Sequence, residues 1–166
     1  DQYVCDPVID LESGVQEDTK AVHAYRQELL PLATVATPNR REAALLSNMD
    51  VEEVGKLTGA KKAAEKIMKS GCRAVVIKGL LTGERVVDLF YDGSEFIEFP
   101  ARRLNTKNTY GAGTLFSAIL AAMLAQGIEL PTAVDHARSF VSQAIEHHVR
   151  IGKDVHPVNV LALTPQ

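Results

Sequence analysis

Short apolar runs alternate with helical patterns along the first half of the chain. The runs "YVC", "ATVA" and "CRAVVIKG" have the length and apolar content that are typical of buried strands. The segments between them, about residues 16–31 and 40–71, place apolar residues at helical spacing and end at Pro31 and Gly71. Strands and helices in this order predict an α/β fold with a mainly parallel sheet.

The second half of the chain begins with a different pattern. The segment "RVVDLFYDGSEFIEFP" contains two β-rich runs joined by Asp92-Gly93, which is a strong signal for a β-hairpin. Two long helices are predicted after it, from about residue 113 to 126 and from about residue 131 to 149. No repeat, low-complexity tract or linker interrupts the chain, so we expect a single domain over residues 1–166.

Composition and charge exclude several kinds of partner. Hydrophobic residues make up 46% of the chain and charged residues 23%, as in an ordinary globular domain. The net charge of -3, without clustered Lys and Arg, argues against a nucleic-acid surface. No apolar run reaches the ~20 residues of a membrane span. The two cysteines fit neither a disulfide framework nor a metal site, and no signal peptide opens the chain, so the expected compartment is the cytoplasm.

Four polar stretches fall at strand ends or at a helix start, where open α/β sheets bind their ligands. They are Asp6-Pro7, "TPNRRE" from Thr37 to Glu42, Lys78-Gly79, and "NTYGAGT" from Asn108 to Thr114. The glycines of the last stretch precede a predicted helix, whose unpaired backbone N–H groups and dipole favour an anion such as phosphate.

Each stretch also has a purely structural explanation. Asp6 before a proline can be a strand-ending turn, and Asn39 with Glu42 fits a capping box at a helix start. Lys78 can be a solvated lysine at the end of a strand, and the small residues of "GAG" permit tight packing of a strand against a helix. The order of all four stretches together is what favours a binding site.

That order resembles the ribokinase-like vitamin kinases. The resemblance is carried by "YVCDPV", "LLPLATVATPNRREAALLS", "AVVIKG", "VDLFYDG" and "NTKNTYGAGTLFSAILAAMLAQG". Its nearest members are the hydroxymethylpyrimidine/phosphomethylpyrimidine kinases of thiamin synthesis and the pyridoxal kinases. The resemblance runs from Tyr3 to about Asn159 and matches the later part of such a kinase. It therefore implies a ribokinase-like fold whose N-terminal part is absent.

The resemblance implies a role for each stretch in an ATP-dependent kinase that uses Mg²⁺. Asp6 and Glu42 stand where the family holds the metal ion, which takes one or two carboxylates when it bridges nucleotide phosphates. The residues implied in nucleotide binding are Thr37, Asn39, Lys78, Asn108 and Thr109. The implied catalytic turn, with its anion hole, comprises Gly111, Ala112, Gly113 and Thr114.

Thr114 departs from the family pattern. The wider family carries Asp at this position, and the pyrimidine-kinase branch often carries Cys. A threonine hydroxyl does not ionise near neutral pH, so Thr114 cannot serve as a general base, although it can still form a hydrogen bond at the turn. Asn105 and Tyr110 also depart from the pattern, because they stand where Asp and His are common.

The function that the resemblance implies is phosphorylation of the hydroxymethyl group of a vitamin precursor. The substrate would be a small molecule, either hydroxymethylpyrimidine or its phosphate, or else pyridoxal or pyridoxine. One alternative is a non-catalytic relative that binds a nucleotide or another protein after losing the base and the substrate half. A sugar kinase of the same superfamily is a third hypothesis. The exposed edges of the hairpin could pair with a second copy in a homodimer.

Overall fold

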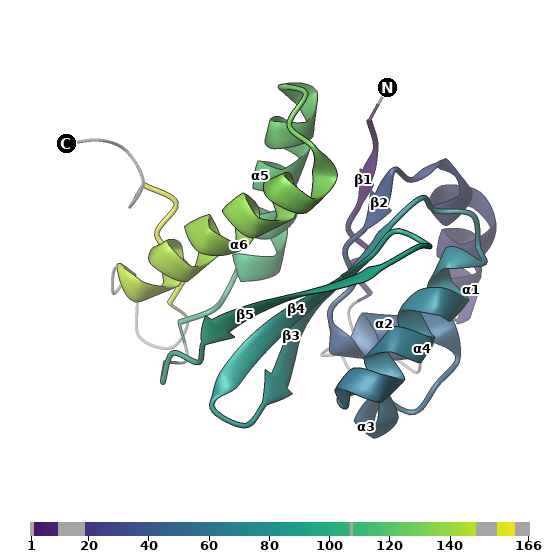
Figure 1. Cartoon of the computed structure of the whole chain (residues 1–166), viewed down its shortest axis with the longest axis horizontal. Coiled ribbons are helices and arrows are strands. Elements are labelled where there is room, and N and C mark those ends of the chain that lie inside the picture. Colours follow the sequence, from purple (N-terminus) through teal and green to yellow (C-terminus); the bar gives the residue numbers. More distant parts are fainter. Residues whose placement is uncertain (1, 10–18, 107, 149–155, 162–166) are drawn as a thin grey trace. The chain divides into compact units, whose positions relative to one another are not determined.

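A five-stranded sheet in the order β1-β2-β3-β4-β5 organises the chain (Figure 1). The computed structural model describes residues 2–9, 19–106, 108–148 and 156–161. The strands are β1 (Val4–Cys5), β2 (Val35–Ala36), β3 (Val75–Thr82), β4 (Arg85–Tyr91) and β5 (Phe96–Arg102). β1, β2 and β3 are parallel, and β4 runs antiparallel to β3. The predicted α/β fold is confirmed, as a mixed sheet with a parallel part formed by the first three strands.

The helices follow the predicted order. Those before β3 are α1 (Thr19–Ala24), α2 (Arg40–Ser47), α3 (Val51–Val54) and α4 (Leu57–Met68). A π-helical turn (Tyr25–Leu29) and a 3₁₀ turn (Leu30–Leu32) continue α1, so Pro31 lies in its last turn. α5 (Ala112–Ala125) and α6 (Leu130–Glu146) follow β5. None of the described helices is both long enough and apolar enough to cross a membrane.

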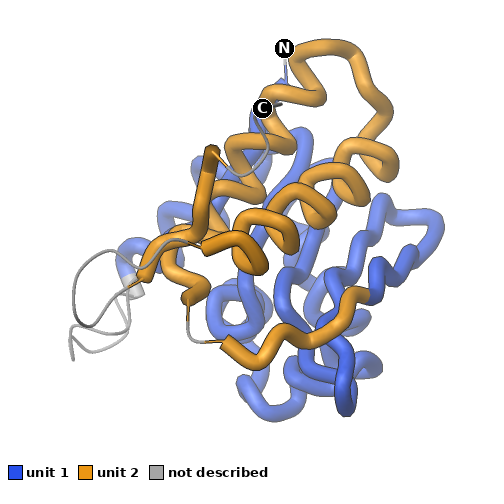
Figure 2. Tube along the Cα trace, turned by 90° about the vertical axis from the view of Figure 1, so that its left-hand side faces the viewer, with its two compact units in different colours: residues 1–100 blue, residues 101–166 orange. Residues whose placement is uncertain are grey.

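The chain divides into two compact units, residues 1–100 and residues 101–166 (Figure 2). In the second unit, α5 packs against α6. Residues 156–161 belong to the same unit, where Val158 N–H donates to the Tyr110 carbonyl at 3.1 Å and Tyr110 pairs with Pro157 in a parallel bridge. The expectation of a single domain over residues 1–166 stays a prediction.

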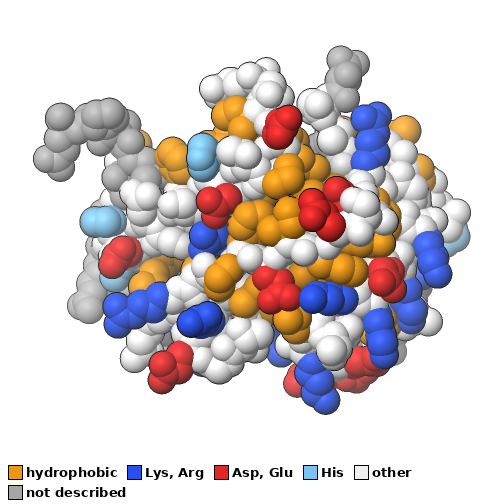
Figure 3. All heavy atoms as spheres, viewed as in Figure 1, with side chains coloured by type: hydrophobic (Ala, Val, Ile, Leu, Met, Phe, Trp, Pro, Cys, Tyr) orange, Lys and Arg blue, Asp and Glu red, His pale blue; other side chains and the backbone are white. Residues whose placement is uncertain are grey.

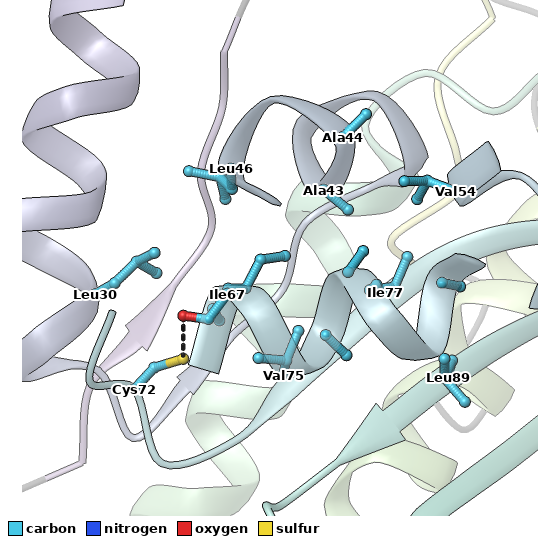
Figure 4. Packing of buried hydrophobic residues seen from close by; sticks show 14 of the residues in the cluster. Leu30, Ala43, Ala44, Leu46, Val54, Ile67, Cys72, Val75, Ile77 and Leu89 are labelled. Atoms are coloured by element: carbon cyan, nitrogen blue, oxygen red, sulfur yellow. Dashed lines mark hydrogen bonds between the residues drawn. The ribbon is translucent and has the colours of Figure 1, made fainter. Parts of the chain in front are cut away.

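Helix α2 packs against β3, and α4 packs against β3 and β4, through fully buried side chains (Figure 4). Leu46 of α2 and Ile67 of α4 belong to the same buried cluster as Val75 and Ile77 of β3 and Leu89 of β4. Burial of one such side chain contributes about 1.5–3 kcal/mol relative to exposure. The cluster also contains residues of β1 and β2, so it holds in place the three strands that carry Asp6, Thr37 and Lys78.

Charges of both signs are mixed over the molecular face drawn in Figure 3. Asp and Glu side chains lie among the Lys and Arg side chains on that face, which shows no continuous basic area. On this face the distribution agrees with the net charge of -3.

The prediction that the third strand ends at Lys78-Gly79 is wrong. β3 continues to Thr82 and turns directly into β4, and the two strands form an antiparallel hairpin that is not among the predicted elements. The ladder is irregular between Ile77 and Leu80, and Gly79 has a φ of 72° there. A glycine can end a strand or form a β-bulge inside one. At Gly79 it forms a bulge, and the strand continues.

The predicted turn at Asp92-Gly93 is confirmed as the connection between neighbouring strands β4 and β5. The carboxylate of Asp92 accepts hydrogen bonds from the backbone N–H groups of Ser94 at 2.8 Å and Glu95 at 2.9 Å. These bonds lower the pKa of Asp92. An Asp side chain that caps its own turn in this way fixes the chain reversal locally.

Candidate functional site

Asp6, Thr37 and Lys78 meet at one edge of the sheet. Asp6 follows β1, Thr37 follows β2, and Lys78 lies within β3, the third of these parallel strands. Thr37 Oγ1 donates to Asp6 Oδ1 at 3.1 Å, and Lys78 Nζ donates to the same oxygen at 2.9 Å. The parallel strands β1 and β2 end at the same edge, and Lys78 lies beside them because it pairs with Asn39 after β2, so the topology gathers these three side chains.

Asn39 and Glu42 form a capping box at the start of α2. Asn39 Oδ1 accepts from the backbone N–H groups of Arg41 at 2.8 Å and Glu42 at 3.0 Å, while Glu42 Oε2 accepts from Asn39 N–H at 2.7 Å. The structural explanation of this motif is therefore confirmed. The motif also lies beside the strand ends, because Asn39 pairs with Lys78 in a parallel bridge.

Glu42, Asp6 and Lys78 form one electrostatic group, which we call the edge cluster. Burial raises the pKa of Glu42, whose exposed fraction is only 7%. The hydrogen bond from Asn39 and the positive charge of Lys78 oppose this increase in pKa, whereas the negative charge of Asp6 adds to it. When all three groups are ionised, two carboxylates share one ammonium. This balance favours a cation over a bare anion at the cluster.

The stretch from Asn108 to Thr114 forms the turn into α5, within the second unit. Gly111 precedes the helix with a φ of 82°, a conformation that residues with a side chain rarely adopt. Ala112 N–H donates to the Thr109 carbonyl at 3.1 Å. Thr114 lies exposed in the first turn of α5. The start of this 14-residue helix has the dipole orientation that favours an anion.

The predicted site residues thus fall into two groups. The first unit brings together Asp6, Thr37, Asn39, Glu42 and Lys78 at the sheet edge. The second unit holds Asn108, Thr109, Gly111, Ala112, Gly113 and Thr114 in one turn. Each group is contiguous within its own unit, and its role in nucleotide binding stays a prediction.

A family model described as phosphomethylpyrimidine kinase matches residues 1–159. The chain belongs to this family. It is 40% identical over 162 residues to the hydroxymethylpyrimidine/phosphomethylpyrimidine kinase of Rhizobium meliloti, a match that covers 94% of this chain and 59% of that protein. It is also 38% identical over 164 residues to the pyridoxine kinase of Bacillus subtilis, covering 96% of this chain and 59% of that protein.

Solved structures of pyridoxal kinases confirm the ribokinase-like fold. The pyridoxal kinase of Staphylococcus aureus in complex with ADP superposes with a TM-score of 0.89 at 34% identity, over 97% of this chain and 58% of that one. The ADP complex of Bacillus subtilis pyridoxal kinase gives a TM-score of 0.86 at 36% identity, over 96% and 59%. The chain therefore spans about 59% of the length of these relatives.

The buried acid Asp88 is not among the site residues predicted from the sequence. Asp88 lies in β4 with an exposed fraction of 8%, and its Oδ1 accepts the Gly79 N–H at 2.7 Å. The signal in the sequence is a single acid inside the apolar run "VVDLFY". Because Asp is almost never buried without a partner, that position indicates a specific contact.

Proposed function

We propose that this chain is the nucleotide-binding portion of an ATP-dependent kinase, located in the cytoplasm, that phosphorylates the hydroxymethyl group of a vitamin precursor. The precursor is hydroxymethylpyrimidine or its phosphate, or pyridoxal or pyridoxine, since relatives carry the names of both kinds of kinase. The observation that carries the proposal is the edge cluster, in which Lys78 Nζ of β3 lies 2.9 Å from Asp6, the residue that follows β1. Membership of the family and its nucleotide-bound relatives support the same reading.

Each group of site residues has, within its own unit, chemistry that suits nucleotide phosphates. In the first unit Lys78 supplies a positive charge, and in the second unit the start of α5 supplies backbone dipoles; both kinds of group stabilise the charge that phosphoryl transfer spreads over oxygens. Phosphoryl transfer depends mainly on positioning and on stabilisation of this charge. As the family resemblance implies, we assign nucleotide binding to each group within its own unit, and a terminal phosphate to the turn from Gly111 to Thr114.

The donor set of the edge cluster fits Mg²⁺. Asp6 and Glu42 offer carboxylate oxygens, and Mg²⁺ in phosphotransferases takes one or two carboxylates together with waters and phosphate oxygens. Within the described residues, no group of three or more His, Cys, Asp or Glu side chains could hold a metal ion. The remaining ligands of Mg²⁺ would therefore be waters and phosphate oxygens. When bound, Mg²⁺ would neutralise charge on the nucleotide phosphates. Asp6 and Glu42 would hold it, and Lys78 limits the repulsion between their two carboxylates.

Thr114 supports a second candidate function, that of a nucleotide-binding relative without catalysis. It lies exposed in the first turn of α5, and its hydroxyl has no accessible ionisation near neutral pH. A kinase with this turn must remove the substrate proton without a side-chain base, through the substrate itself or through water. A relative that no longer catalyses transfer has no such requirement.

Calorimetry and a phosphorylation assay on this chain test both candidates. We expect ADP with Mg²⁺ to bind, and Lys78→Met to weaken binding about tenfold, the contribution of one charge-assisted hydrogen bond. Lys62→Met is the matched control, because Lys62 is an exposed lysine that pairs with Glu53. Glu42→Gln should reduce the Mg²⁺ dependence of binding while keeping the capping contact to Asn39.

The assay then separates the two functions. Transfer of phosphate from ATP to either alcohol identifies the kinase and its substrate. Binding of the nucleotide without transfer to any of the alcohols would favour the non-catalytic relative. Absence of nucleotide binding at millimolar concentration would contradict both.

A further inference from the structure

Two residues of β3 lie opposite a single residue of β4. The ladder pairs Ile77 with Leu89 and next pairs Leu80 with Val87. Between these pairs, β3 contains Lys78 and Gly79, whereas β4 contains only Asp88. This arrangement is a β-bulge, which bends the strand and re-aims a side chain.

The bulge determines which side chains of β3 point to the core face of the sheet before and after it. Val75, Ile77 and Leu80 all belong to the buried cluster beneath α2 and α4. In a regular strand, Ile77 and Leu80 would point to opposite faces, because successive side chains alternate. The extra residue keeps both on the core face, and it places Lys78 at the sheet edge with its ammonium on Asp6.

The two backbone N–H groups of the bulge donate to acceptors on the two sides of β3. Lys78 N–H donates to the Pro38 carbonyl at 2.9 Å, in the segment that follows β2. Gly79 N–H donates to Asp88 Oδ1 at 2.7 Å, and Gly79 has a φ of 72°. The Asp88 side chain thus provides the partner that a regular ladder would supply from the backbone of β4. A short bond to a carboxylate is stronger than one between neutral groups.

We propose that Asp88 is a positioning residue for Lys78. Its carboxylate stabilises the bulge by accepting the Gly79 N–H. The bulge in turn keeps the Lys78 ammonium in the edge cluster, where the ammonium contacts a phosphate of the nucleotide. Asp88 itself need not touch the nucleotide. The last step rests on the proposed function, whereas the link from Asp88 to Lys78 is a property of this chain by itself.

Nuclear magnetic resonance of lysine side chains tests the link without any ligand. The ¹⁵Nζ resonance of Lys78 is assigned by its loss in Lys78→Arg, and the exposed Lys62 serves as the reference. We expect Asp88→Ala to move the Lys78 resonance toward that of Lys62 and to speed exchange of its ammonium protons. Asp88→Asn, which keeps an oxygen acceptor for Gly79 N–H, should leave both unchanged. Val87→Ala, a core truncation at the next position of β4, should lower stability and leave the Lys78 resonance in place.

Gly79→Ala tests the same link from the other strand. Nothing lies within 4 Å of an added Cβ at this position, but a φ of 72° is strained for alanine. The variant should therefore fold and shift the Lys78 resonance in the same direction as Asp88→Ala. It also keeps the proposal testable if Asp88→Ala does not fold.

Affinity for ADP with Mg²⁺ tests the functional step. Asp88→Ala should weaken binding about tenfold, as loss of one charge-assisted contact would, and should cause no further loss in a Lys78→Met background. An equal loss in that background, or an unchanged Lys78 resonance in folded Asp88→Ala, would overturn the proposal. If the parent chain binds no ADP but the resonance moves as expected, the proposed function fails and the positioning of Lys78 by Asp88 stands.

Discussion

Lys78 Nζ and Asp6 Oδ1 lie 2.9 Å apart, although the two residues are separated by 72 positions in the chain. The contact joins β3 to the end of β1, two strands that are not neighbours in the sheet. The two side chains are only 11% and 20% exposed. A pair that is shielded in this way is screened less by salt than a pair on the open surface.

The shielding predicts a measurable coupling between the two residues. In a double-mutant cycle with Lys78→Met and Asp6→Asn, we expect a coupling energy of about 1–3 kcal/mol in the free energy of unfolding. The matched control is the pair Lys62 and Glu53, whose side chains are 66% and 49% exposed at 3.6 Å. That pair should couple by less than about 1 kcal/mol. Denaturant unfolding measures both cycles, and equal coupling in the two would contradict the shielding argument.

The stability of the chain should depend on pH through Glu42. Burial raises the pKa of Glu42 above its ordinary value of 4.5, so between that pH and the raised pKa the folded chain keeps a proton that the unfolded chain releases. By linkage, the stability that this proton contributes is complete below pH 4.5 and is lost as the pH rises through the folded pKa. Glu42→Gln removes the titration, so its stability relative to the parent should increase as the pH rises.

Unfolding curves at a series of pH values measure this difference. Glu65→Gln, on the exposed side of α4, is the control for loss of an acid elsewhere. A constant difference between Glu42→Gln and the parent at all pH values would show that burial of this carboxyl has no effect on its protonation.

The turn before α5 should lose nucleotide affinity when it gains negative charge. Gly113→Asp places a carboxylate beside the backbone groups that we assign to the terminal phosphate, so binding of ADP should become undetectable in calorimetry. Asp is well tolerated in the first turn of a helix, and the circular dichroism spectrum should stay unchanged. Glu129→Gln, at the start of α6 in the same unit, serves as a variant distant from the turn. Unchanged affinity in Gly113→Asp would remove the phosphate from this turn.

An ionisable side chain at position 114 should accelerate phosphoryl transfer. A positioned general base contributes about 10²–10⁴-fold in rate, and Thr114 cannot act as one. In a protein completed with the N-terminal segment of a related kinase, Thr114→Asp or Thr114→Cys should raise kcat at least about tenfold, the low side of that range. Saturating nucleotide keeps changes in binding out of the comparison. Equal turnover with Thr, Asp and Cys would place proton removal elsewhere.

Those parts of the fold that depend on local signals were predictable from the sequence. The capping box of Asn39 and Glu42 is encoded within four consecutive residues, and the Asp92 turn is fixed by its own side chain. Pro31 at the end of the first helical segment and the two long helices near the C-terminus are similarly local. In each case a few neighbouring residues decide the backbone conformation, so no knowledge of distant contacts is needed.

The hairpin of β3 and β4 and the role of Asp88 were not predictable in this way. Gly79 has the same appearance in the sequence whether it ends a strand or bulges it, and only the register with β4 distinguishes the two. The partner of Asp88 is a backbone amide on the neighbouring strand, so its contact exists only after the strands pair. The gathering of Asp6 and Lys78 could be expected from parallel topology, but not the 2.9 Å contact itself.

The extra residue in β3 also determines where the strand can lose one residue without moving its buried side chains to the other face. Removing one residue from a regular strand transfers every following side chain to the opposite face of the sheet. At the bulge the result differs, because loss of Gly79 would set one residue opposite Asp88 and leave Leu80 paired with Val87 on the core face. Loss of Val76 would instead shift the buried residues before the bulge out of register. Deletion of Gly79 alone would thus remove the bulge that orients Lys78, while the core register on both sides of it is kept.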